Sequence, residues 1–282
     1  MMLLTSVDSA HDMAVVRCSI VAASMCVAVS LHAQQPATNA AAETALARME
    51  SAYTTLPALH IKARWSAKYS GGMSAEDFPL PGPDVLELRM QRPNKLYMSS
   101  ASKRDGSQSS YLVVSDGITL TYWKSSTNSF IQKKAPAALA DIAALLPDDA
   151  IGVTIDGTWE EESIAEWDLL ADPRARSIRK IADGLSGLLT LTGSEKMANA
   201  QVNVVRLALP SGALPFEIEQ RFYLDAESYL LRGLATSARG KHPETGRDFT
   251  VEMRAVYDLH NTQPTFNDSA FRFVAPRGAQ PE

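Results

Sequence analysis

The chain has 282 residues, of which 45% are hydrophobic and 21% are charged, and this composition suits a globular protein with a sizeable core. Lys and Arg together number 27 against 32 Asp and Glu, which gives a net charge of −5 at pH 7. A weakly acidic chain lacks the basic surface that attracts nucleic acids and anionic membranes. We therefore expect no nucleic-acid partner.

Residues 1–33 are expected to form a secretory signal peptide. Arg17 precedes an uncharged run from Cys18 to Leu31, and Ala33 is the small residue after which cleavage is expected. The run is shorter than the about 20 residues that a transmembrane helix needs. An uncleaved membrane anchor is the alternative, and Met13 competes with Met1 as the start of translation.

Chemically reactive side chains are sparse in the rest of the chain. Both cysteines, Cys18 and Cys26, lie in the signal peptide, so the exported chain has no thiol for disulfides, catalysis or metal binding. The remaining histidines, His60, His242 and His260, are far apart and lack the spacing of a metal-binding pair. The sequence contains no nucleophile elbow, phosphate-binding loop or dinucleotide fingerprint. We expect no metal, no cofactor and no enzymatic activity.

Paired acidic side chains are the remaining candidates for catalysis. Glu217 and Glu219 point to one face of an expected strand, where they alternate with Phe216 and Ile218. We interpret this carboxylate pair as part of a solvated outer face of a sheet.

The exported chain is expected to begin with a flexible leader at residues 34–42, followed by a helix at Glu43–Leu56 that Pro57 ends. The helix carries an apolar residue at every third or fourth position: Leu46, Met49, Tyr53 and Leu56. Leu59–Tyr69 then alternates apolar and polar residues throughout its length. This alternation predicts a strand with one buried and one solvated face.

Similar patterns predict further strands along the whole chain. They are expected around Leu86–Met90, Leu96–Met98, Ser110–Ser115, Ile118–Trp123, Phe130–Lys133, Leu185–Thr192, Gln201–Leu209, Phe216–Leu224, Tyr229–Ser237 and Phe249–Tyr257. Asp116–Gly117 indicates a tight hairpin turn, and we also interpret Thr192–Ser194 as a hairpin turn. Because no linker or repeat divides the chain, we expect one large, strongly curved antiparallel sheet.

Two helices are expected to interrupt the strands. Ala137–Leu146 is apolar on nearly all sides, as suits a helix sunk into a concave sheet, and Trp159–Leu170 follows a capping-box pattern. The alternating strands are expected to present a shared apolar face: Trp65, Tyr69, Leu86, Leu88, Met90, Leu96, Met98, Leu112, Val114, Leu120, Tyr122 and Phe130. Such a face can be filled by the helices of the chain itself, or it can hold a ligand.

Four sequence stretches resemble the periplasmic lipoprotein carriers LolA and LolB and their relative RseB. The stretches are the helix and strand at Leu46–Tyr69, the Arg-Pro turn at Arg92–Tyr97, the Ser-Asp-Gly hairpin at Val114–Tyr122 and the closing Phe-x-Phe pattern at Phe271–Gly278. The resemblance implies an α+β fold, in which an incomplete antiparallel β-barrel of about 10–11 strands carries an N-terminal helix and two or more lid or plug helices. It places this single domain at residues 43–278.

The resemblance also implies a function without catalysis, namely a periplasmic monomer that shelters the acyl chains of lipoproteins or other lipids. The cavity would be lined by Trp65, Leu88, Met90, Met98, Leu120, Tyr122 and Phe130, with Leu139, Ile142 and Leu146 in a lid. Arg92 would latch that lid, and a membrane-bound donor or acceptor protein would be the partner. An RseB-like sensor that acts on a membrane-anchored regulator is the alternative, and an exported enzyme is a third interpretation.

Overall fold

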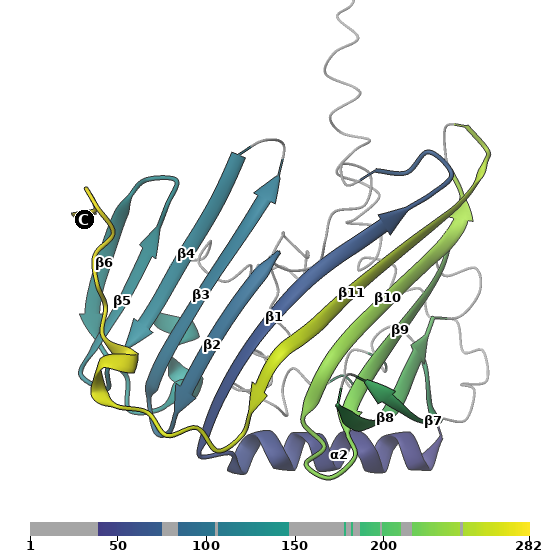
Figure 1. The fold of residues 1–282 in the computed structure, drawn as a ribbon, viewed down its shortest axis with the longest axis horizontal. Helices are drawn as coiled ribbons and strands as arrows, with labels where there is room; N and C mark the ends of the chain where they lie inside the picture. The colour runs from purple at the N-terminus through teal and green to yellow at the C-terminus, as the bar shows by residue number, and fades with distance from the viewer. Residues whose placement is uncertain are drawn as a thin grey trace, which may run out of the picture.

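The computed structural model describes residues 39–74, 84–104, 107–146, 178, 182, 187–197, 199–209, 216–242 and 245–282. These residues include the α-helix α2, three short 3-10 helices and a single sheet (Figure 1). The elements are α2 (Ala40–Thr55), β1 (Ala58–Tyr69), β2 (Val85–Gln91), β3 (Lys95–Arg104), β4 (Ser107–Ser115), β5 (Thr119–Lys124), β6 (Ser129–Lys134), β7 (Leu188–Met197), β8 (Ala200–Ala208), β9 (Phe216–Asp225), β10 (Leu231–Lys241), β11 (Asp248–Asn261) and β12 (Gln280–Pro281).

The sheet is built from two runs of hairpins that meet at β1. Its order is β12-β6-β5-β4-β3-β2-β1-β11-β10-β9-β8-β7. Neighbouring strands are antiparallel, apart from β12, which pairs with β6 in parallel. The strands form an open, curved surface with α2 across one end, below β1 and β7–β11 (Figure 1). The predicted fold, an incomplete antiparallel barrel with an N-terminal helix, is therefore confirmed.

Helix α2 begins at Ala40, three residues before the expected start and inside the expected leader. The side chain of Asn39 explains the difference, because its Oδ1 accepts a hydrogen bond of 2.8 Å from the backbone N–H of Ala41. A side-chain oxygen at this position satisfies an N–H group that has no partner within the helix. Leu56 and Pro57 end the helix and lead directly into β1.

Two local expectations are wrong. Thr192–Ser194 is not a hairpin turn but a β-bulge within β7, where Gly193 has a φ of +133°. Residues 137–146 do not form one α-helix, since they contain two short 3-10 helices at Leu139–Asp141 and Ala143–Leu145. The expected helix at Trp159–Leu170 lies outside the described residues.

The two faces of the sheet differ in chemistry. We call the face of Leu59, Ile61 and Ala63 the inner face, and the face of Lys62 and Arg64 the outer face. Cross-strand register extends the inner face through the apolar residues of β2, β3 and β5. Leu46, Met49 and Tyr53 of α2 are fully buried in the same core cluster. The helix thus closes one end of the inner face.

In β4 the expectation for the inner face is off by one residue. Val113 pairs with Met98 and with Tyr122, so it lies on the inner face, whereas Leu112 and Val114 lie on the outer face.

None of the helices that the structure describes is long and apolar enough to span a membrane.

Candidate ligand-binding face

Five of the predicted lining residues lie together on the inner face. Leu88, Met98 and Tyr122 belong to one cross-strand row, and Met90 and Leu120 belong to the neighbouring row nearer to α2. Leu88, Met90 and Met98 are fully buried, and Leu120 and Tyr122 are nearly so. The residue types and alternating positions predicted from the sequence therefore converge on one apolar surface.

Trp65 lies farther along the same face. It is half-buried, packs against the same core cluster and pairs across the sheet with Ala255 of β11. The core cluster against which it packs contains residues of both β1–β5 and β7–β11.

Phe130 does not share this surface. It pairs with Trp123, whose neighbour Tyr122 is on the inner face, so Phe130 points to the outer face. Its ring lies 5.2 Å from the ring of Phe273 in the C-terminal segment. The neighbouring Ile131 occupies the inner-face position opposite Tyr122. Because Phe130 and Ile131 are both apolar, the sequence does not reveal which of the two points inward.

The segment expected to form a lid is anchored at both ends. Leu139 and Ile142 are fully buried and Leu146 packs against the same cluster as the inner face. The backbone N–H of Leu139 donates to the carbonyl oxygen of Pro93 at 3.0 Å. At the other end, Nζ of Lys133 donates to the carbonyl oxygen of Leu145 at 2.7 Å.

Arg92 is bonded to the end of α2. Its Nε donates to the carbonyl oxygen of Leu56 at 3.0 Å and its Nη2 donates to that of Tyr53 at 2.9 Å. Burial of the guanidinium lowers the pKa of Arg92. These side-chain bonds go to the end of α2, where a cation complements the exposed carbonyl groups. The contact with the lid segment is made by the next residue, Pro93, whose carbonyl oxygen accepts the hydrogen bond from Leu139.

Several features of this face were not predicted. A second apolar cluster occupies its other end, away from α2, and contains Ala238, Phe249, Val251 and Met253 with Tyr69 and Phe216 packed against it. The alternation of Phe249–Tyr257 contains the signal for this cluster. The hydroxyl groups of Ser100 and Tyr257 are also buried on the inner face without a partner among the described residues, and no sequence pattern indicates that they lack one.

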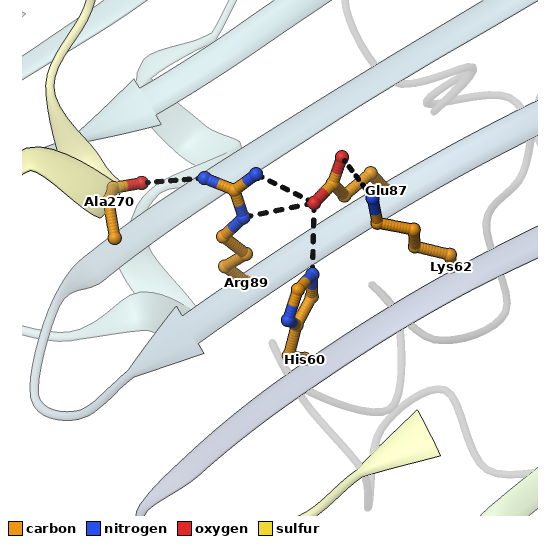
Figure 2. A network of polar contacts seen from close by, with 5 residues as sticks. All are labelled: His60, Lys62, Glu87, Arg89 and Ala270. Carbon is orange, nitrogen blue, oxygen red and sulfur yellow. Dashed lines mark hydrogen bonds and ion pairs between the residues drawn. The ribbon is translucent and has the colours of Figure 1, made fainter. Parts of the chain in front are cut away.

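The outer face carries a polar network on β1 and β2 (Figure 2). Glu87 accepts hydrogen bonds from Arg89, at 2.7 and 3.0 Å, and pairs with His60 at 2.9 Å and Lys62 at 3.4 Å. Burial acts to raise the pKa of Glu87, but the bonds from Arg89 and His60 outweigh it and lower the pKa below its usual value. Arg89 also reaches the carbonyl oxygen of Ala270 at 3.4 Å, which ties the C-terminal segment to the sheet.

A second network confirms the expected outer-face position of Glu219. Its carboxylate lies between Arg206 and Arg221, and the hydrogen bonds from these arginines lower its pKa despite the opposing effect of burial. Both networks are ion pairs that hold strands together. Among the residues that the structure describes, no group of three or more His, Cys, Asp or Glu side chains is placed to hold a metal ion.

Residues 42–155, less than half of the chain, match a family model described as "Predicted periplasmic protein (DUF2092)". No curated protein matches the chain. Similar solved structures include the lipoprotein LppX from Mycobacterium tuberculosis, with 13% identity, a TM-score of 0.37 and coverage of 82% of this chain and 100% of that one. LprF from Mycobacterium bovis has 10% identity, a TM-score of 0.41 and coverage of 82% and 97%.

A chain of the MucA/MucB complex from Pseudomonas aeruginosa is also similar, with 12% identity and a TM-score of 0.33. The match covers 83% of this chain and 62% of that one.

Proposed function

We propose that this protein is a periplasmic carrier that shelters acyl chains against the inner face of its sheet. The observation that carries the proposal is the continuous apolar surface formed by Leu88, Met90, Met98, Leu120 and Tyr122, which α2 closes at one end. The description of the matched family as periplasmic supports the compartment. Export would use residues 1–33 as a cleaved signal peptide.

Binding of this kind needs no catalytic group. Each methylene group removed from water contributes about 0.8 kcal/mol, so a sixteen-carbon chain gains on the order of 10 kcal/mol before opposing costs. Ordering the ligand and opening the protein reduce this gain. We therefore propose a binding protein and not an enzyme.

The ligand has to displace part of the existing core, because the lining residues are already buried. The segment with Leu139 and Ile142 is the best candidate for displacement. It is short, and the helices that the structure describes in it are two 3-10 helices of three residues each. Arg92 fixes the end of α2, and the adjacent Pro93 accepts the bond from Leu139. Arg92 would thus couple the lid segment to the helix and act as its latch.

The decisive experiment is native mass spectrometry of the protein purified from the periplasm of its own organism. A carrier is expected to retain a lipid or lipopeptide, which would appear as an added mass that organic extraction removes. The delipidated protein should then take up a fluorescent fatty acid in a saturable manner. Protein that carries no lipid and takes up neither fatty acids nor lipopeptides would contradict the proposal. Sequencing of the purified N-terminus tests cleavage after Ala33.

A further inference from the structure

Three hydroxyl groups on the inner face are buried without a hydrogen-bond partner among the described residues. One is Oγ1 of Thr236, opposite Met253, and the other two are Oγ of Ser100 and Oη of Tyr257. Ser100 is 4% exposed and Tyr257 is 8% exposed. A buried hydroxyl without a partner is unfavourable for folding, so it calls for an explanation.

Ser100 and Tyr257 lie at the same level of the sheet. Tyr257 pairs with Ala63, Ala63 pairs with Leu86, and Leu86 pairs with Ser100. Three strand spacings of about 4.8 Å separate the two backbones, which is about 14 Å along the sheet. Tyr111, opposite Ser100, extends this row of hydroxyl-bearing residues.

Apolar surface flanks the row on both sides. Toward α2 lie Ile61, Leu88 and Met98, and in the opposite direction lies Trp65 with the second apolar cluster beyond it. An alkyl chain bound along the inner face would therefore pass or end at a level where hydrogen-bond donors are available.

The surroundings of the row favour an uncharged group. The ring of His260 stacks on Tyr257 with centroids 6.0 Å apart. Burial, together with the charge of Arg232, lowers the pKa of His260 to about 4 against the opposing charge of Asp225, so this imidazole is neutral at neutral pH. A neutral carbonyl oxygen can accept a hydrogen bond from a hydroxyl group without the desolvation cost of a carboxylate or phosphate.

We propose that Ser100 and Tyr257 donate hydrogen bonds to the ester carbonyl oxygens of an acylglycerol ligand. The same diacylglycerol ester chemistry occurs in a free glycerolipid and in the lipid anchor of a lipoprotein. The inference rests on the proposed function and adds the chemical class of the ligand and the depth at which its ester groups lie.

The test compares two ligands that differ only in these carbonyl groups. Delipidated full-length protein is loaded with the dye N-phenyl-1-naphthylamine, which is then displaced by 1,2-dioctanoylglycerol or by its diether analogue 1,2-dioctylglycerol. The wild-type protein is expected to bind the ester about tenfold more tightly, as two additional modest hydrogen bonds would provide. A synthetic triacylated lipopeptide in a third arm distinguishes a lipoprotein anchor from a free lipid as the preferred source of the ester.

Ser100→Ala and Tyr257→Phe remove one hydroxyl each with little change of shape. Each is expected to weaken ester binding about threefold and to leave ether binding unchanged. Ser237→Ala is the matched control, because its Oγ is likewise buried and unpartnered among the described residues but lies on the outer face, opposite Glu252. In ligand-free protein, Tyr257→Phe should maintain or raise the melting temperature, since it removes an unsatisfied group.

The possible outcomes separate the two proposals. Equal wild-type affinity for ester and ether, or equal weakening of both in the variants, would overturn the role of the hydroxyl groups while leaving the carrier function intact. Failure of the wild-type protein to bind the dye, the ester, the ether and the lipopeptide would overturn the carrier function itself.

Discussion

The guanidinium of Arg92 donates a hydrogen bond of 2.9 Å to the carbonyl oxygen of Tyr53, 39 positions earlier in the chain. A second bond goes to the carbonyl oxygen of Leu56. Arg92 thus caps the C-terminal end of α2 and fixes the helix to the turn between β2 and β3. Tyr53 in turn accepts a bond from the backbone N–H of Leu231 through its hydroxyl group. Three hydrogen bonds thus connect this helix end to both halves of the sheet.

Replacement of Arg92 tests this connection. Arg92→Lys keeps the charge but cannot form both bonds in the same geometry, so the free energy of unfolding should fall by about 1–3 kcal/mol. Urea unfolding measures the change. Arg239→Lys, at an exposed position of β10, is the control and should have little effect. Equal losses in both variants would show that the bonds to α2 contribute nothing specific.

Leu139 and Ile142 should contribute to stability and also limit ligand exchange. Truncation of either side chain to Ala leaves a cavity in the core and should lower the free energy of unfolding by about 2–5 kcal/mol. If the segment is a lid, both variants should also release a bound fluorescent fatty acid faster than wild type. Val274→Ala, which changes a side chain that is 72% exposed, provides the comparison. Loss of stability without faster release would argue against a lid.

The stability of the protein should decrease between pH 6.5 and pH 4 because of His260. Burial lowers its pKa to about 4 in the folded protein, whereas an unperturbed histidine has a value of 6.5. Between these values the unfolded chain binds a proton that the folded chain excludes, so the free energy of unfolding falls as the pH falls. The loss is at most on the order of 3 kcal/mol.

His260→Phe should reduce this dependence while retaining an aromatic ring beside Tyr257. The measurement is urea unfolding at several pH values from 7 to 4. Glu87 and Glu219, whose pKa values are lowered, cause a further loss in both proteins below about pH 4.5. Parallel stability curves for the variant and wild type between pH 6.5 and 4.5 would contradict the assignment to His260.

Gly71 and Gly72 form a matched pair at the end of β1. Both have a positive φ, of 71° and 90°, so an alanine at either position is strained by about 1 kcal/mol. A Cβ on Gly71 would also lie 2.1 Å from the carbonyl oxygen of Asp248, whereas one on Gly72 would meet nothing within 4 Å. Gly71→Ala should therefore cost roughly 1–3 kcal/mol more than Gly72→Ala. Thermal unfolding of both variants would detect the difference, and equal Tm values would rule out the clash.

The sequence predicted the strands in which apolar and polar residues alternate, because this alternation distinguishes a buried face from a solvated one. The alternation at Leu59–Tyr69 identified β1 and its inner face, and the Asp-Gly pair at residues 116–117 identified the hairpin between β4 and β5. Runs of consecutive apolar residues were less informative. In β4 the run Leu112–Val114, and in β6 the pair Phe130 and Ile131, are compatible with either orientation, and only pairing with the neighbouring strand decides.

Other features depend on contacts between distant residues. Residues 137–146 have a composition that suits an α-helix, but the bonds from Leu139 to Pro93 and from Lys133 to Leu145 engage their backbone from outside the segment. Such tertiary bonds compete with helical ones and override helix propensity. The unpartnered hydroxyl groups of Ser100 and Tyr257 are equally inaccessible to sequence analysis, because their burial results from strands that are far apart in the chain.

The two-residue strand β12 covers the edge of the sheet at β6. The N–H of Gln280 donates to the carbonyl oxygen of Asn128, and the N–H of Glu282 donates to that of Phe130. Pro281 between them has no N–H to offer to a further strand. A sheet edge covered in this way is a poor template for the addition of a strand from another molecule.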